Sequence, residues 1–231
     1  MDSVKLSLPQ DADVRVDEAI KTLRTNIQFS GKSIKVIMLT STVPNEGKSV
    51  ISWRTAQAFA QMGKRTLYID ADIRKSVFYQ RMKPDHEIRG LSQYLSGQCT
   101  MDESICHTNI PNLDVTFAGP YAPNPTELFE EEAFHALITF GRENYDMVVV
   151  DTAPLGSVID AAIIARECDG AIMVVESGNI GYKLLNRTKQ QLQRTGVKVL
   201  GVVLNKVPMR KGSYYGSYYG NYYGKYDHYY E

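Results

Sequence analysis

A short stretch of the chain has the residue types and the spacing of a phosphate-binding loop. Residues 41–49 read Ser-Thr-Val-Pro-Asn-Glu-Gly-Lys-Ser and lie between an apolar run, residues 34–40, and a segment of helical length, residues 49–62. Backbone N–H groups of such a loop, and of the helix that follows it, bind phosphate oxygens. Lys48 is placed to neutralise the β- and γ-phosphates, and the Ser49 hydroxyl to bind Mg²⁺. The stretch predicts a nucleoside triphosphate site.

The loop is a variant of the pattern G-x-x-x-x-G-K-[ST]. Thr42 replaces the usual first glycine, and Asn45 stands where glycine is common, although asparagine tolerates a positive φ. Gly47 allows a phosphate to approach the backbone closely. We expect ATP to contact Pro44, Asn45, Glu46, Gly47, Lys48, Ser49 and Val50, with Asn205, just past the last predicted strand, as the candidate for the adenine base.

Acidic residues follow two further apolar runs. Asp70 and Asp72 come at the end of residues 66–69, and Asp151 follows residues 147–150. Ligands in open α/β sheets bind at the carboxyl ends of strands, and alternation directs Asp70 and Asp72 to the same side. A single aspartate after a strand is more often a helix cap or turn residue. Two such positions together with the loop favour a site for a metal ion and a terminal phosphate.

The C-terminus is rich in tyrosine. Residues 212–231 contain nine of the fifteen tyrosines of the chain, arranged in Tyr-Tyr-Gly repeats. Such a repeat has no aliphatic residue and no helical or strand period with which to build a core, so the rings should be exposed. The hydroxyls are then available for chemistry, and the alternative is an aromatic low-complexity segment used for adhesion. The candidate acceptors are Tyr214, Tyr215, Tyr218, Tyr219, Tyr222, Tyr223, Tyr226, Tyr229 and Tyr230.

The elements that must position these residues alternate between strand and helix. Apolar strands are predicted at residues 34–40, 66–69, 147–150, 171–175 and 197–204, and helices at residues 14–29, 49–62, 127–142 and 182–194. This alternation predicts an α/β fold with a mainly parallel sheet and helices on both faces. Residues 76–120 are interpreted as short helices and loops near a site. We expect one domain, residues 1–208, and a disordered tail, residues 209–231.

The composition of the chain argues against some classes of binding partner. The chain has 26 basic and 26 acidic residues, so the positive field expected of a general nucleic-acid binder is missing. Three cysteines without metal-ligand spacing are typical of reduced thiols in a cytosol. No stretch approaches the ~20 apolar residues of a membrane span, and the first thirty residues lack a signal-peptide core. We therefore expect any membrane association to come through a partner.

With these motifs the sequence resembles, over nearly its whole length, the bacterial tyrosine kinases of capsule and exopolysaccharide synthesis, and in particular the cytoplasmic kinase subunit of Gram-positive bacteria. Residues 41–49 are similar to the Walker A motif of that family, residues 69–74 to its second Walker motif and residues 149–154 to its Walker B motif. The tyrosine-rich end is similar to its autophosphorylation cluster. Residues 124–128, Asn-Pro-Thr-Glu-Leu, also resemble a segment common in the family, to which the sequence assigns no chemical role.

The resemblance implies a P-loop NTPase-type fold and an ATP-dependent protein-tyrosine kinase that autophosphorylates its C-terminal cluster and regulates capsular or extracellular polysaccharide synthesis and export. In that mechanism Lys48 stabilises the transferring phosphoryl group, while Ser49, Asp72 and Asp151 organise Mg²⁺. Asp70 orients and deprotonates the attacking tyrosine.

The resemblance also implies partners and a location. These are a membrane-bound polysaccharide co-polymerase activator, whose cytoplasmic C-terminal segment completes the nucleotide site, a cognate tyrosine phosphatase and a ring of identical chains. The protein would then be cytoplasmic and peripheral at the inner face of the membrane.

One motif bears on assembly. Glu18, Lys21 and Arg24 are similar to the family's E-x-x-R-x-x-R oligomerisation motif and lie at helical spacing on one face. Lys21 departs from that pattern, because lysine keeps the charge but loses the bidentate fork of arginine. The alternative is an ordinary solvated helix face with an i,i+3 ion pair.

Two other functions remain open on sequence. A partitioning or site-selection ATPase of the ParA and MinD kind shares the variant loop, but its K-G-G-x-G-K-T pattern would place lysine at Val43 and glycine at Pro44. A nucleotide-binding scaffold that never phosphorylates would use the aromatic tail for adhesion. Replacing the tail tyrosines by phenylalanine separates the scaffold from the kinase, because stacking survives the loss of the hydroxyl and phosphoryl acceptance does not.

Overall fold

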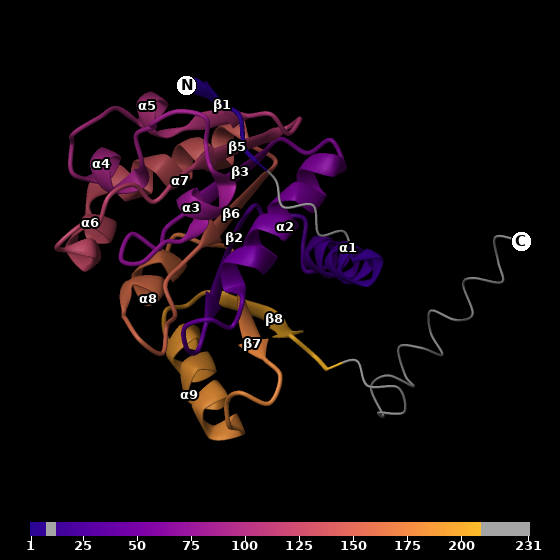
Figure 1. Cartoon of the computed structure of the whole chain (residues 1–231). Coiled ribbons are helices and arrows are strands. Elements are labelled where there is room, and N and C mark those ends of the chain that lie inside the picture. The colour runs from indigo at the N-terminus through magenta and orange to yellow at the C-terminus, as the bar shows by residue number, and fades with distance from the viewer. Residues whose placement is uncertain (8–12, 209–231) are drawn as a thin grey trace, which may run out of the picture.

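The computed structural model describes residues 1–7 and 13–208, and the structural statements below concern those residues (Figure 1). The strands are β1 (Asp2–Val4), β2 (Val36–Ser41), β3 (Thr66–Asp70), β4 (Cys106–Thr108), β5 (Leu113–Thr116), β6 (Met147–Asp151), β7 (Gly170–Glu176) and β8 (Lys198–Asn205). The helices are α1 (Val14–Phe29), α2 (Lys48–Gln61), α3 (Phe78–Met82), α4 (Leu91–Leu95), α5 (Met101–Ser104), α6 (Pro125–Glu130), α7 (Glu132–Asn144), α8 (Asp160–Ala165) and α9 (Tyr182–Gln193). The predicted tail lies outside the described residues.

The described strands form one sheet in the order β1-β4-β5-β3-β6-β2-β7-β8. Its neighbours pair in parallel except for β4 with β5, which are antiparallel. The sheet confirms the predicted mainly parallel α/β architecture. The five strands expected from apolar runs correspond to β2, β3, β6, β7 and β8, with bounds that differ by one or two residues.

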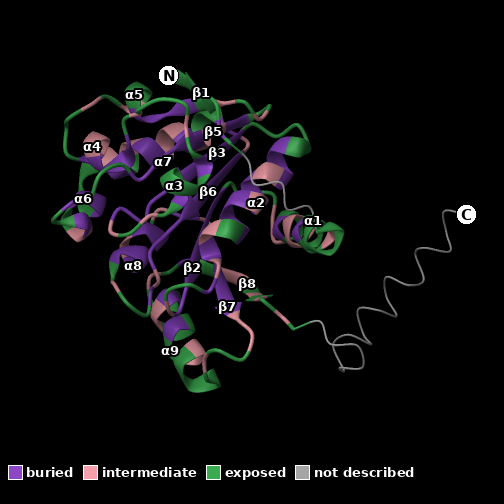
Figure 2. Ribbon diagram, viewed as in Figure 1, coloured by how far each residue is buried: buried purple, intermediate pink, exposed green. Residues whose placement is uncertain are grey.

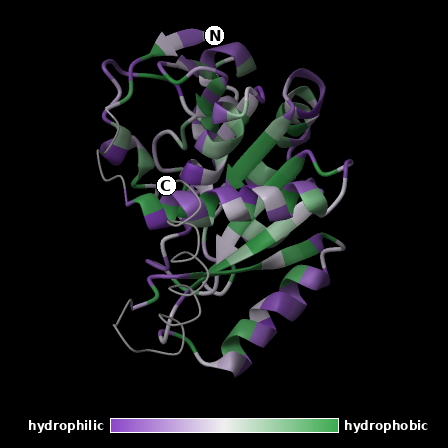
Figure 3. Cartoon of the chain, turned by 90° about the vertical axis from the view of Figure 1, so that its right-hand side faces the viewer, coloured by the Kyte–Doolittle hydropathy of each residue, from purple (hydrophilic) through white to green (hydrophobic). Residues whose placement is uncertain are grey.

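Helices cover both faces of this sheet, as predicted. Ile37 and Leu39 of β2 belong to an apolar cluster with α1, α2 and α3, whereas Val36 and Met38 belong to a second cluster with α4, α6, α7, α8 and α9. Such alternation follows from the two-residue period of a strand, and a run buried on both sides reads as continuously apolar. Figure 2 shows the buried strands enclosed by helices whose outer sides are exposed, and Figure 3 shows the same central strands as the most hydrophobic part of the chain.

Residues 76–120 contain more than the predicted short helices and loops. Strands β4 and β5 extend the sheet there, and β1 pairs with β4 at its edge. These strands are three or four residues long and partly exposed, so they lack the apolar run that marks the central strands. The pattern-based interpretation was therefore incomplete in this region.

The helix predicted at residues 127–142 is in fact two helices. α6 ends before Glu131, whose ψ of 151° is extended, and α7 starts at the next residue. Pro125 occupies the first turn of α6, where the missing N–H costs nothing. The short helix α8, which the apolar pattern also did not predict, packs beside α6. Thr126 contacts Arg74, just past the end of β3, so the segment 124–128 lies close to the carboxyl edge of the sheet.

Helix α1 lies against α2 outside the sheet (Figure 1). Ile20 and Ile27 are buried in the apolar cluster on this side of the sheet, whereas Val16 is 37% exposed. The side chain of Asp13 caps the helix by accepting the N–H of Arg15 at 3.0 Å. Ile20 and Ile27, which lie two turns apart on the same face of α1, are therefore the buried apolar residues that hold α1 to the domain.

The three residues of the expected oligomerisation motif do not act as one group. Lys21 Nζ and Glu18 Oε1 form an exposed ion pair at 2.6 Å. Arg24 instead turns to α2, where its Nη1 donates to the carbonyl of Ala58 at 3.2 Å. That carbonyl belongs to the last turn of α2, where backbone acceptors lack intrahelical partners. Within this chain Arg24 thus stabilises the end of α2.

Candidate active site

The phosphate-binding loop joins β2 to α2 in the conformation that its sequence predicts. Asn45 has a φ of 68° and Gly47 a φ of 89°, so asparagine does adopt the left-handed conformation at this position. A Cβ at residue 47 would lie 2.2 Å from Nδ2 of Asn205. Glycine is required there for both reasons, and α2 begins at the next residue, Lys48, with its N-terminal N–H groups beside the loop.

Glu46 organises the loop from inside. Its side chain is completely buried, with Oε2 accepting the N–H groups of Thr42 at 2.8 Å and Val43 at 2.9 Å. Oε1 accepts the N–H of Glu176, at the end of β7, at 3.0 Å. The carboxylate therefore satisfies backbone donors rather than facing the ligand side, which leaves the backbone N–H of Glu46 as its group for a phosphate. A loop glutamate is usually exposed, so the sequence contained no signal for this role.

The end of β8 braces the same loop. Asn205 Nδ2 donates to the carbonyl of Glu46 at 2.9 Å, and Lys206 Nζ donates to the carbonyl of Asn45 at 2.7 Å. Lys206 also forms an ion pair with Oε2 of Glu176 at 3.0 Å. Asn205 thus lies at the loop, as expected of a residue near the nucleotide, and the tail begins three residues beyond Lys206. Its contact with adenine stays a prediction.

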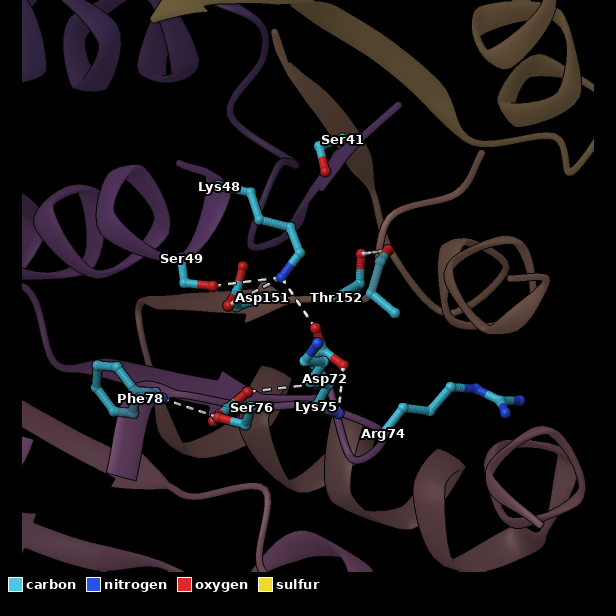
Figure 4. A network of polar contacts seen from close by, with 12 residues as sticks. Ser41, Lys48, Ser49, Asp72, Arg74, Lys75, Ser76, Phe78, Asp151 and Thr152 are labelled. Atoms are coloured by element: carbon cyan, nitrogen blue, oxygen red, sulfur yellow. Dashed lines mark hydrogen bonds and ion pairs between the residues drawn. The ribbon is translucent and has the colours of Figure 1, made fainter. Parts of the chain in front are cut away.

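Lys48 meets two of the predicted aspartates, Asp72 and Asp151, at the carboxyl edge of the sheet (Figure 4). Asp70 and Asp151 are directly opposite each other in the pairing of β3 with β6. Lys48 Nζ lies 3.2 Å from Oδ2 of Asp72 and 3.7 Å from Oδ2 of Asp151. It also lies 3.3 Å from the hydroxyl of Ser49. The structure therefore brings together residues that are up to 103 positions apart in the chain.

Burial controls the electrostatics of this cluster. Removal from water raises the pKa of Asp70 to about 7, with the charge of Asp151 adding to the shift and the hydroxyl of Ser76 opposing it. Burial likewise raises the pKa of Asp151, against the opposing effect of Lys48. Burial tends to lower the pKa of Lys48, but the charges of Asp151, Asp72 and Asp70 outweigh it and raise that pKa. The ammonium group therefore stays protonated among more carboxylates than it can neutralise.

Local hydrogen bonds hold each carboxylate in place. Oδ2 of Asp70 accepts the hydroxyl of Ser76, and its Oδ1 accepts the N–H of Asp72 at 3.3 Å. Oδ1 of Asp151 accepts the hydroxyl of Ser52 at 2.9 Å. Ser52 and Ser76 were not among the predicted site residues. Ser52 lies one helical turn after Lys48 on α2, so its spacing could have identified it.

The oxygen donors at this edge fit Mg²⁺. Oδ2 of Asp151 is buried and accepts no hydrogen bond from the described residues, and the hydroxyl of Ser49 and the carboxylate of Asp72 lie beside the same ammonium group. The described part of the chain holds no group of three or more His, Cys, Asp or Glu side chains arranged to bind a metal. Mg²⁺ ordinarily takes one or two protein carboxylates and completes its shell with water and phosphate oxygens. Asp72, Asp151 and the hydroxyl of Ser49 provide a set of ligands of this kind.

None of the helices within residues 1–7 and 13–208 has the length and apolar composition needed to cross a membrane. The predicted acceptor tyrosines lie outside the described residues. The structure therefore describes the nucleotide side of the proposed reaction and the position from which the tail starts.

Comparison with known proteins identifies the domain. Residues 37–215 match the CbiA family model, described as the CobQ/CobB/MinD/ParA nucleotide binding domain. The chain is therefore a nucleotide-binding P-loop protein. That family includes both MinD and ParA, so the fold by itself does not separate a kinase from a partitioning ATPase.

Closer relatives make that distinction. The chain is 43% identical to the tyrosine-protein kinase CpsD of Streptococcus agalactiae over 200 residues, which cover 87% of this chain and 86% of the relative. It superposes on the chimerical protein CapA2B2 with a TM-score of 0.81 and 33% identity, covering 90% of this chain and 95% of the other. The kinase domain of Escherichia coli tyrosine kinase ETK gives a TM-score of 0.81 and 31% identity, covering 85% and 78%. Identity of this extent over most of each chain means that the protein belongs to the family of bacterial tyrosine-protein kinases.

Proposed function

We propose that this kinase transfers the γ-phosphoryl group of ATP to tyrosine hydroxyls, foremost those of its own residues 209–231, and thereby regulates the synthesis and export of a capsular or extracellular polysaccharide. The observation that carries the proposal is the position of Lys48. Its ammonium group stands at the start of α2, next to the phosphate-binding loop, and is held at 3.2 Å by Asp72. A cation anchored there stabilises charge on a phosphoryl group in transit.

Different groups of the loop and of the strand ends around it would bind the phosphates, the metal ion and the adenine base. Backbone N–H groups from Pro44 to Val50 bind phosphate oxygens, and Gly47 allows their close approach. Ser49, Asp72 and Asp151 would hold Mg²⁺, which supplies positive charge to the phosphate oxygens when bound. Ser52 keeps the carboxylate of Asp151 oriented through its 2.9 Å hydrogen bond. Asn205, fixed to the loop by its amide nitrogen, keeps its carbonyl oxygen as an acceptor for the adenine amino group.

Asp70 is proposed to orient the attacking tyrosine and to accept its proton. A free phenol has a pKa near ~10, so a carboxylate helps mainly as the phosphoryl group is transferred and the phenol becomes more acidic. Asp70 is fixed from two sides, by Ser76 and by the N–H of Asp72. Positioning should therefore contribute more than basicity.

The domain, residues 1–208, and the tail, residues 209–231, are proposed to act as enzyme and substrate. The 23 residues from Met209 onward could span at most ~80 Å when extended, which reaches the site of the same chain or of a neighbour. We favour transfer between chains in a ring, assembled through the helix that carries Glu18, Lys21 and Arg24. Each phosphate adds a charge of about −1.5 to −2, so repulsion between phosphorylated tails would favour disassembly.

Membership of the family supports two partners and a location. A membrane-bound polysaccharide co-polymerase would activate the kinase through its cytoplasmic C-terminal segment, which completes the nucleotide site. A cognate tyrosine phosphatase would reverse the modification. The kinase would then work in the cytoplasm, held at the inner face of the membrane by its activator.

The test is to incubate the purified chain with Mg²⁺ and ATP, with and without the activator's cytoplasmic segment, and to map phosphate by mass spectrometry. The control is Lys48→Met, which removes the ammonium group but keeps most of the side-chain volume. We expect phosphate on several tyrosines between Tyr214 and Tyr230, dependent on Lys48. ATP hydrolysis by the activated protein with those tyrosines left unmodified would instead support the partitioning-type ATPase.

A further inference from the structure

A hydrogen-bonded triangle of three side chains, those of Arg74, Thr126 and Asp160, lies next to the candidate active site. Nε and Nη2 of Arg74 donate to the two carboxylate oxygens of Asp160, at 2.5 Å and 2.9 Å. Nη2 also donates to the hydroxyl of Thr126 at 3.0 Å, and that hydroxyl donates to Oδ1 of Asp160 at 2.9 Å. Three segments that are far apart in sequence meet here: the turn after β3, the first turn of α6 and the first residue of α8.

This triangle has the features of a strong interaction. The side chain of Asp160 is 2% exposed, so its contact with Arg74 is shielded from solvent on the carboxylate side. The pairing is bidentate, which matches the planar fork of a guanidinium to a carboxylate. The hydrogen bond to Asp160 is also the main cause that raises the pKa of Arg74 above its ordinary value. A lysine at this position would keep the charge but could not reproduce both bonds.

Arg74 belongs to the same turn as the carboxylates of the active site but points away from them (Figure 4). Asp72, two residues before it, contacts Lys48, and Oδ1 of Asp72 accepts the N–H of Lys75, the residue directly after Arg74, at 3.1 Å. Ser76, two residues after it, donates to Asp70. A shift of the backbone at Arg74 would therefore move groups that hold both Asp70 and Asp72.

The other end of the triangle is attached to the phosphate-binding loop. Asp160 follows a turn in which the N–H of Leu155 donates to the carbonyl of Ser41, at the end of β2, at 2.9 Å. Gly156 in the same turn lies so close to Thr42 that a Cβ would come within 2.0 Å of the carbonyl oxygen of Thr42. These contacts connect the phosphate-binding loop to Lys48 by way of Asp160, Arg74 and Asp72. Because Lys48 directly follows the loop, both ends of this series of contacts lie at the loop.

We propose that Arg74, Asp160 and Thr126 form a clamp that fixes the turn after β3 and sets the position of Asp72 relative to Lys48 during phosphoryl transfer. These three are positioning residues, because they act through Asp72 and Lys48 rather than by touching the nucleotide. The clamp assigns a role to the segment 124–128, which places Thr126 at the triangle. The inference rests on the proposed kinase function.

The test compares Arg74→Lys and Thr126→Val with Thr126→Ser in the full chain, activated as above. Arg74→Lys removes the fork, Thr126→Val removes the hydroxyl at nearly constant volume, and Thr126→Ser keeps the hydroxyl. We expect kcat for tyrosine phosphorylation to fall on the order of tenfold in Arg74→Lys, a loss typical of a small displacement of reacting groups. We expect a smaller fall in Thr126→Val and near-normal activity in Thr126→Ser. KM for ATP should stay within about twofold in all three, because none of the substitutions changes a residue of the loop that binds the phosphates.

Arg142→Lys is the matched control. Nη1 of Arg142 contacts Oδ1 of Asp169 at 2.7 Å at the opposite edge of the sheet. The side chain of Arg142 is 35% exposed, close to the 32% of Arg74, although Asp169 is less buried than Asp160, at 21% against 2%. This substitution should lower stability while leaving kcat unchanged. If it lowers kcat as much as Arg74→Lys does, the effect is general destabilisation and the clamp is wrong.

Amide hydrogen exchange of residues 70–78 in the nucleotide-free protein gives a second readout that needs no activity. Exchange should be faster in Arg74→Lys and Thr126→Val and unchanged in Arg142→Lys. Wild-type exchange and wild-type kcat in both clamp variants would overturn the clamp while leaving the kinase assignment intact. Lack of any Lys48-dependent phosphotyrosine would instead overturn the proposed function, and the exchange data would then decide on the clamp alone.

Discussion

The two edges of the central sheet use aspartate in opposite ways. At the amino edge Asp169 accepts the N–H groups of Lys35 and Val36, each at 2.8 Å, together with the guanidinium of Arg142 at 2.7 Å. Burial alone would raise the pKa of Asp169, but these donors outweigh it and hold that pKa below its ordinary value. The carboxylate is more stable folded than unfolded, so this edge stabilises the fold.

At the carboxyl edge the same residue type is held unfavourably. Asp70 and Asp151 are each 1% exposed and face each other across two paired strands, and burial is the main cause that raises the pKa of both. The single ammonium group of Lys48 cannot balance Asp70, Asp72 and Asp151 together. A carboxylate at the end of a strand therefore stabilises the sheet when backbone N–H groups donate hydrogen bonds to it. Where a cation and phosphate are to bind, such donors are fewer and the buried negative charge is unfavourable until the ligand is present.

The largest expected effect tests the carboxyl edge directly. Lys48→Met should lower the rate of phosphotyrosine formation by roughly 10³-fold or more, because the phosphoryl group loses the cation that stabilises it. Lys206, the other cation described at the loop, is bound to the carbonyl of Asn45 and to Glu176 instead. Far-ultraviolet circular dichroism should show an intact fold. Undiminished phosphorylation in the purified variant would remove the basis for treating this edge as catalytic.

A second substitution should separate activity from stability. Asp70→Asn should reduce kcat on the order of 10²-fold, because the attacking hydroxyl loses the group that orients it. The same change should raise the free energy of unfolding of the nucleotide-free protein by about 1 kcal/mol, since it removes one buried charge that faces Asp151. Urea denaturation measures the gain. A clear loss of stability would contradict the interpretation of this edge as electrostatically unfavourable.

A matching substitution at the amino edge should lower stability and leave activity unchanged. Asp169→Asn should lower the free energy of unfolding by about 2 kcal/mol, because charge-assisted hydrogen bonds to Lys35, Val36 and Arg142 are weakened. The specific activity of the folded enzyme should be unchanged. Kinase assays below the unfolding transition check this point, and a large loss of kcat would show that the two edges are not functionally separate.

The dependence of stability on pH sharpens the comparison. The folded pKa of Asp169 lies below its unfolded value, near ~3.9, so its contribution is fully present above that value. It is lost as the pH falls from ~3.9 through the folded pKa. On acidification between about pH 6 and pH 3, the free energy of unfolding measured in urea should therefore fall less in Asp169→Asn than in the wild type. Equal slopes in the two proteins would argue against this account.

The smallest effect is expected far from both edges. Lys21→Ala breaks the ion pair with Glu18, whose side chains are 54% and 41% exposed. Exposed pairs of this kind contribute little because water screens them, so the free energy of unfolding should change by less than ~0.5 kcal/mol. Calorimetry at a protein concentration low enough to keep the chains dissociated measures it, so that the proposed ring does not contribute. A larger change in the dissociated chain would contradict the view that water screens this pair.

Much of the fold could be predicted because its signals are local. Five strands were predictable as apolar runs, and the helices on both faces follow from their alternation with these strands. The short edge strands β1, β4 and β5 were not predictable, because three or four residues carry no period. The break between α6 and α7 at Glu131 was missed for a related reason, since the apolar spacing continues across it.

By itself the sequence determined the chemical types at the site: a glycine before Lys48, a hydroxyl after it and acids at two strand ends. Only the tertiary structure decided that Glu46 turns inward, that Arg24 serves α2 and that Arg74 reaches Thr126 and Asp160, 52 and 86 residues away. The physical reason is that a motif specifies side chains within one turn of backbone. A long polar side chain bonds to whichever donor or acceptor the packing of distant loops brings within about 3 Å, and no local pattern encodes that neighbour.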